Sequence, residues 1–246
     1  MWISYRIRRG IIRLFRLKLS TLKILETFII ATGSFAISIT VPMVFGFDKL
    51  VIICIMSVLL IHELGHFCTM KYFKCKNTRI MFFWIIGITT TSSVVKSRIN
   101  RTVISMAGPV PGIVLGSVLL ILYRDLSEEI MFFAESLVVI NFFNVIPIAI
   151  LDGGHIFESL FIPNSNKKIG IFNFITGTGS FIFCFLNKDY FILWLCIIII
   201  LRGIIFFRHR KEQPIIELNG IIKPKQKILF TAIWVGAIFV GLVSII

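Results

Sequence analysis

Long apolar runs alternate with short polar stretches along almost the whole chain. Seven of these runs come close to the ~20 residues that a helix needs to cross the hydrocarbon core of a bilayer. They cover residues 24–45, 50–70, 103–123, 130–150, 169–186, 190–207 and 228–246. The pattern predicts an all-α polytopic membrane protein with about seven transmembrane helices.

One further apolar segment, residues 80–95, is too short to cross the membrane as a helix. It contains an unbroken run of hydroxyl residues from Thr89 to Ser93, and its threonines favour a strand over a helix. Backbone that is not helical is tolerated at membrane depth only against protein or water. We therefore expect a short re-entrant β-hairpin in this segment.

The first 23 residues combine basic and apolar positions at helical spacing. Arginines recur every three or four residues, and isoleucines and a leucine recur between them: Arg6, Arg9, Arg13 and Arg16, with Ile3, Ile7, Ile11 and Leu14. This predicts a basic amphipathic helix on an anionic membrane surface. A positively charged segment that fixes the orientation of the first span would have the same pattern, and both interpretations can hold. A cleaved signal peptide fits less well, because the next apolar stretch is long and lacks a small-residue cleavage site. The expected organisation is a segment 1–23 followed by a single transmembrane domain, 24–246.

Composition and charge agree with a membrane protein. The chain is 57% hydrophobic with a mean hydropathy of +0.94, whereas soluble domains average about 45–50% apolar residues. With the N-terminus in the cytoplasm, all 26 basic residues except Lys49, Arg124 and Lys188 fall on the cytoplasmic side. The net charge of +14 thus marks loops on one side of a membrane, and we expect no nucleic-acid partner.

The second span ends in His62-Glu63-Leu64-Gly65-His66, an HExxH motif. Two histidines at i and i+4 lie on one helical face, so both imidazoles can reach one metal ion. Glu63 is placed beside them, where it can act as general base. Two satisfied core histidines are the alternative, but a glutamate inside an apolar helix is costly and marks function by default.

A third ligand has to come from another span, and the candidate acids are Glu135, Asp152 and Glu158. Asp152 follows a span that runs in the same direction as the HExxH span, so the two sites should lie at a similar depth. Two histidines and one carboxylate leave a fourth position for water, as catalytic zinc requires. A helix terminus or an ion pair with Lys167 or Lys168 is the other interpretation of Asp152.

Two asparagines precede Asp152 on the fourth span. Asn141 and Asn144 are three residues apart and share a helical face, and Pro147 removes a helical hydrogen bond just after them. Their amides can bond a substrate or an oxyanion, and equally a neighbouring helix. The five cysteines form no CxxC pair, and we predict none of them as zinc ligand or disulfide partner: Cys54, Cys68, Cys75, Cys184 and Cys196.

Taken together, these residues resemble the site-2 protease family of intramembrane zinc metalloproteases. The resemblance rests on the HExxH motif, on Ala107-Gly108-Pro109, and on Asn144-Val145-Ile146-Pro147 running on to Leu151-Asp152-Gly153-Gly154-His155. It covers roughly residues 51–160, the expected catalytic core. Ala149 stands where the family often has a second proline, and no stretch is long enough for an appended PDZ or CBS domain.

The resemblance implies one catalytic Zn²⁺ held by His62, His66 and Asp152, with Glu63 as general base. It implies substrate contacts for Asn144 and Asn141, and a structural rather than a ligating role for His155. The expected substrates are membrane proteins or signal-peptide remnants, and a regulatory membrane partner fits the lack of a sensor domain. The expected location is a prokaryotic cell membrane, crossed several times, with the N-terminus in the cytoplasm.

Two other functions would use the same cluster. A zinc transporter or another metal-binding membrane protein would need ligands at several depths, whereas Glu135 and Glu158 stand alone in the sequence. An inactive scaffold that binds transmembrane helices would have no need of Glu63. Proteolysis inside the membrane is the function that the sequence favours.

Overall fold

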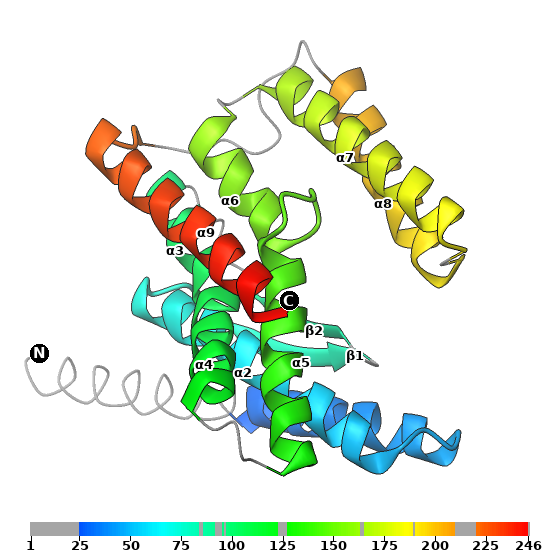
Figure 1. Cartoon of the computed structure of the whole chain (residues 1–246). Coiled ribbons are helices and arrows are strands. Elements are labelled where there is room, and N and C mark those ends of the chain that lie inside the picture. The colour runs from blue at the N-terminus through cyan, green and yellow to red at the C-terminus, as the bar shows by residue number, and fades with distance from the viewer. Residues whose placement is uncertain are drawn as a thin grey trace, which may run out of the picture.

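The computed structural model describes residues 25–83, 86–91, 95, 97–122, 127–162, 165–188, 190–209 and 220–245, without the side chains of residues 83, 86 and 190–195. Within these ranges the chain is mostly helical and contains one two-stranded sheet (Figure 1). The basic amphipathic helix predicted for residues 1–23 lies outside the described residues.

The elements follow one another through short connections. A first helix, Leu25–Val44, precedes α2 (Lys49–Tyr72), β1 (Arg79–Phe83), β2 (Ile86–Thr90), α3 (Arg98–Ala107), α4 (Pro109–Leu122), α5 (Glu128–Val145), α6 (Asp152–Phe161), α7 (Asn166–Leu186), α8 (Tyr190–Arg208) and α9 (Pro224–Ile245). The two strands form the antiparallel hairpin that was expected between residues 80 and 95.

Five helical stretches of the described chain are long and apolar enough to cross a membrane. They are the first helix, α2, α3 and α4 taken together, α7 and α9. These stretches agree with five of the seven predicted spans, and the number of seven stays a prediction.

The predicted span 130–150 is wrong at its C-terminal end. The helix α5 stops at Val145, and Ile146 is already extended, with φ −65° and ψ 138°. Proline disfavours helical geometry in the residue before it, so Pro147 ends the helix one residue earlier than its own position. Asp152 therefore does not end a span but begins a separate short helix, α6.

Two clusters of buried side chains hold the helices and the hairpin together. One joins α3, α4, α5, α6 and α9 around Ile113, Val145, Ile156 and Trp234. The other joins the first helix, α2 and the hairpin around Met56, Ile80 and Phe82. The α7–α8 pair stands to one side of this bundle (Figure 1).

The hairpin is fastened on both sides. On the side of the first helix, the Phe82 backbone N–H donates to the Ser34 hydroxyl at 3.1 Å, and Arg79 pairs with Glu26 at 2.9 Å. On the side of α2, the Thr89 hydroxyl donates to the Glu63 carboxylate at 2.6 Å. The first helix therefore covers the outer edge of β1, while β2 lies against the helix that carries the HExxH motif.

Replacing Ser34 by alanine should loosen this hairpin. The Phe82 N–H would lose its acceptor in a buried position, which costs about 1 kcal/mol. We expect Ser34→Ala to lower the free energy of unfolding by about that amount in detergent–SDS mixtures. Thr40→Val is the control, because the Thr40 hydroxyl bonds the Ala36 carbonyl of its own helix. Equal stability of the Ser34→Ala variant and the wild type would contradict the proposed fastening.

Candidate metal centre

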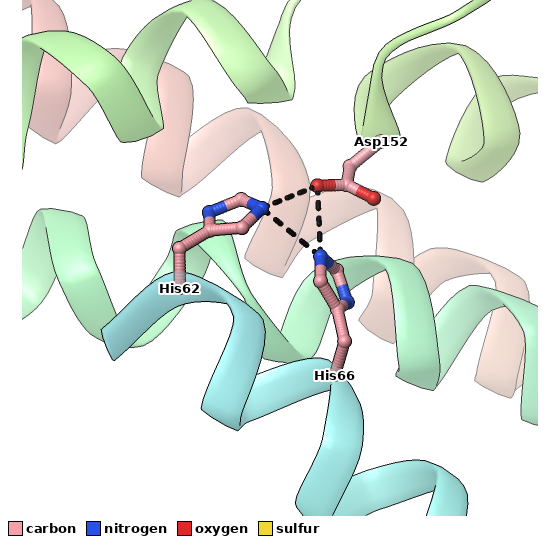
Figure 2. Close-up of side chains that lie close together, drawn as sticks. All are labelled: His62, His66 and Asp152. Carbon is pink, nitrogen blue, oxygen red and sulfur yellow. Dashed lines mark hydrogen bonds and ion pairs between the residues drawn. The ribbon is translucent and has the colours of Figure 1, made fainter. Parts of the chain in front are cut away.

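His62 and His66 lie one turn apart on α2 and are both buried, with relative exposures of 4% and 7%. Their Nε2 atoms face each other at 3.0 Å. Asp152, in the first turn of α6, brings its Oδ2 atom to 3.1 Å from each of these nitrogens (Figure 2). The three residues predicted as ligands are thus gathered at one point, from two helices that are far apart in the sequence.

The far side of each imidazole ring fixes which nitrogen carries the proton. His66 Nδ1 lies 2.8 Å from the Ile104 carbonyl oxygen, which can only accept. His62 Nδ1 lies 2.7 Å from Asn141 Oδ1, while the Asn141 amide nitrogen donates to the Leu137 carbonyl. Both Nδ1 atoms therefore donate in the neutral rings, and both Nε2 atoms present a lone pair.

This arrangement fits a bound cation. Two imidazole lone pairs and a carboxylate oxygen converge with no donor between them, and such a set repels itself unless a positive charge sits among the three atoms. Two ligands of a tetrahedral zinc ion, each 2.0–2.1 Å from the metal, are about 3.3 Å apart. The observed separations of 3.0–3.1 Å are close to this value, and the donor set of two nitrogens and one oxygen suits zinc.

Glycines let the neighbouring helices approach the ligands closely. A Cβ atom at Gly108, between α3 and α4, would lie 2.4 Å from His66 Nε2 and 2.9 Å from His62 Nε2. A Cβ at Gly112 would meet the Asn141 amide at 2.2 Å. The Ala107-Gly108-Pro109 motif thus forms a wall of the site, and Gly112 makes room for the amide that faces His62.

The two glycines after Asp152 likewise allow a close approach of backbone segments. A Cβ at Gly153 would lie 2.2 Å from the Val145 carbonyl oxygen, and one at Gly154 would lie 2.2 Å from that of Ile148. The segment between α5 and α6 therefore folds directly onto the first turn of α6. Bare backbone is needed here because side chains would push α6 away from α5.

Glu63 is buried on the same helix, with a relative exposure of 5%. Its Oε2 atom accepts the hydrogen bond from Thr89, and the Thr89 hydroxyl also lies 3.2 Å from the Glu63 carbonyl. A Cβ at Gly87 would come within 2.8 Å of Glu63 Oε1. Strand β2 therefore passes directly over the carboxylate, with a residue that has no side chain at the closest point.

The other candidates of the sequence lie apart from this group. Glu135 is exposed on α5, and Glu158 is buried in an ion cluster on α6. Asn144 donates to the Ile140 carbonyl of its own helix and is partly exposed. Asp152 makes its described side-chain contacts with the two histidines, not with Lys167 or Lys168.

Sequence reasoning missed several residues around the ligands. For the amide of Asn141 the sequence left a substrate and a neighbouring helix equally open, and the structure shows it fully buried against His62 of the neighbouring helix α2. No sequence motif includes Thr89, Gly87 or Ile104, so nothing in the sequence indicates that they lie beside the site. One signal was available: glycines recur every fourth residue at positions 108, 112 and 116, a spacing that indicates close helix packing.

Comparison with known proteins agrees with the motifs. Residues 50–135 match the family model for Peptidase family M50, and the family resemblance is confirmed over that stretch. The chain is also similar to the solved structure of the Site-2 Protease from Methanocaldococcus jannaschii, at 21% sequence identity and a TM-score of 0.48, covering 77% of this chain and 92% of that chain. No curated protein sequence matches the chain.

Replacing Gly108 by alanine should fill the space between the ligands. Its Cβ would meet both Nε2 atoms, so we expect zinc affinity to fall by about 100-fold or more. Competition with a chromophoric chelator measures this in the purified protein. Gly179→Ala is the matched control, since a Cβ at that position meets nothing within 4 Å. A Gly108→Ala variant that bound zinc like the control would contradict the proposed geometry.

Replacing Asn141 by leucine should remove the acceptor of the His62 Nδ1–H. We expect zinc affinity to fall by about 10- to 100-fold, as for other partners of metal-binding histidines. Asn144→Leu is the comparison on the same helix, because the Asn144 amide bonds its own backbone. It should leave zinc affinity unchanged. Equal zinc affinities for the two leucine variants would show that Asn141 does not hold His62 for the metal.

Proposed function

We propose that this chain, which matches Peptidase family M50 in its core, is an intramembrane zinc metalloprotease that cuts peptide bonds in or near transmembrane segments of other membrane proteins. The observation that carries the proposal is the convergence of His62, His66 and Asp152 beside a buried Glu63. Titratable groups are costly inside apolar helices, and these four together match the residues that peptide hydrolysis requires.

Zinc would be held by His62 Nε2, His66 Nε2 and an Asp152 carboxylate oxygen. When bound, it supplies Lewis-acid chemistry, which polarises the peptide carbonyl and lowers the pKa of water. The protein supplies the rest. Asn141 and the Ile104 carbonyl hold the two imidazoles in the tautomer that leaves Nε2 free for the ion.

Glu63 acts as general base and then as general acid. Thr89 donates to Oε2 and fixes the plane of the carboxylate, so that Oε1 can take a proton from water. The water oxygen forms a bond to the peptide carbonyl carbon. When the carbon–nitrogen bond breaks, the Glu63 carboxyl passes the proton to the leaving amine. The products are one new carboxylate and one new amine.

Strand β2 offers an edge on which an unwound substrate segment can pair. The Phe82 N–H points to Ser34, so Phe82 and its partner Gly87 form a pair without mutual hydrogen bonds. By alternation the same holds for Ile80 and Thr89. The outward backbone groups of Gly87 and Thr89 are therefore the ones that a substrate strand would meet, next to Glu63.

The remaining parts of the proposal follow from charge and resemblance. The basic residues favour a cytoplasmic N-terminus, which puts the metal centre near the cytoplasmic ends of two helices where water can enter. Substrates would be membrane proteins or signal-peptide remnants of a prokaryotic cell membrane. A membrane partner would regulate access.

The proposal is tested by changing Glu63 to glutamine. We expect Glu63→Gln to abolish cleavage and to keep zinc, because the amide preserves the shape but cannot take the proton. Fragments ending inside predicted transmembrane segments, measured by proteomics of membrane and cytosolic fractions, should appear with the wild type and not with the variant. Glu135→Gln, an exposed site on α5, is the control.

Two results would count against a protease. One is undiminished cleavage by purified Glu63→Gln. The other is zinc-dependent transport into vesicles that survives Glu63→Gln while no fragments form, which would favour a transporter built on the same ligands.

A further inference from the structure

The helix α6 carries Asp152 but gives this residue little support of its own. It has only ten residues, and its N-cap, Leu151, makes no side-chain capping bond. In the described chain, the side-chain contacts of Asp152 are with His62 and His66 alone. The rotation of α6 about its axis, which aims the carboxylate, is therefore set by contacts of the helix as a whole and not by partners of the Asp152 side chain other than the histidines.

An ionic cluster lies on the same helix, about 1.7 turns beyond Asp152. Glu158 has a side-chain exposure of only 2%. Its Oε2 pairs with Arg101 of α3 at 2.8 Å, and its Oε1 pairs with Arg202 of α8 at 3.3 Å. Arg101 also donates to His155 Nδ1 at 2.9 Å. His155 lies three residues from both Asp152 and Glu158, so it is a neighbour of each on the surface of α6.

Arg202 makes a second contact near the proposed metal centre. Its Nη1 atom donates to the Ala149 carbonyl at 2.8 Å, in the segment that joins Asn144 to Asp152. One guanidinium thus ties the segment before Asp152 to the helix after it. Since α6 lies between the core and the α7–α8 pair (Figure 1), Arg202 connects that pair to α6 through charged hydrogen bonds, beside the stacking of Phe157 on Phe172.

We infer that the cluster of Glu158, Arg101 and Arg202 is a positioning device that aims Asp152 at the metal. The guanidinium groups hold α6 from two sides, so the helix cannot turn without breaking charged hydrogen bonds in a poorly solvated place. Arg202 belongs to α8, so a helix of the C-terminal pair would help to complete the metal centre. The inference rests on the proposed metal site.

The test compares Glu158→Gln, Arg202→Gln and the double variant with the wild type, as full-length proteins in detergent micelles. Zinc affinity is measured by chelator competition, and the visible bands of bound Co²⁺ report ligand geometry. Glu135→Gln and Arg208→Gln are matched controls at exposed positions, the latter on α8 itself. The melting temperature of the metal-free proteins separates stability from metal binding.

We expect each single variant to bind zinc about tenfold more weakly and to shift the Co²⁺ bands. The double variant should bind zinc almost as tightly as whichever single variant has the lower affinity, because both changes break the same Arg202–Glu158 contact. The controls should match the wild type. Unchanged zinc affinity and unchanged Co²⁺ bands in both single variants, even with a lower melting temperature, would overturn the inference.

Two further outcomes are decisive. If Glu158→Gln aggregates, Arg202→Lys replaces it, since lysine keeps a charge beside Glu158 but cannot also reach the Ala149 carbonyl. Weakened zinc binding in that variant supports the inference, and wild-type binding overturns it. If the wild type itself holds no zinc, the proposed function fails, and the inference fails with it.

Discussion

Three lone pairs meeting in an apolar helix bundle are the interaction on which the rest of the structure depends. His62, His66 and Asp152 bring two imidazole nitrogens and a carboxylate oxygen within 3.0–3.1 Å of one another in a low dielectric, an arrangement that a bound cation would stabilise. The proposed ligands also need partners that fix their orientation. The Asn141 amide and the Ile104 carbonyl do this for the two imidazoles, and the hydrogen-bonded tautomers follow from these partners.

The second requirement is a close approach of the neighbouring helices to the site, and glycines make this approach possible. At Gly108, Gly112 and Gly153, a single methyl group would collide with a ligand, with a ligand's partner, or with the backbone before α6. Elsewhere in the bundle side chains fill the space between helices, whereas at these three positions the absence of a side chain lets the helices approach one another. The proposed metal centre therefore needs glycines without side chains as well as the residues that would bind the ion.

The site is also joined to elements on both sides of it. The hairpin is pinned to the first helix through Ser34 and laid over Glu63 through Thr89. On the other side, the charged hydrogen bonds of Arg202 link α8 to the carbonyl of Ala149 and to Glu158. Glu63 and the segment that leads to Asp152, the proposed general base and third ligand, are therefore each contacted by a helix or strand outside the HExxH segment.

The sequence by itself determined the membrane class, five of the spans, the hairpin and the shared helical face of His62 and His66, because these depend on local patterns: apolar length, β-prone threonines and the i, i+4 spacing of two histidines. It placed the end of α5 wrongly, since Pro147 disrupts the residue before it and not only its own position. Only the tertiary structure decided that Asn141 faces His62, that Thr89 binds Glu63 and that Arg202 meets Glu158. These pairs join elements 26 to 79 residues apart, and no local periodicity encodes which side chains will meet across such distances.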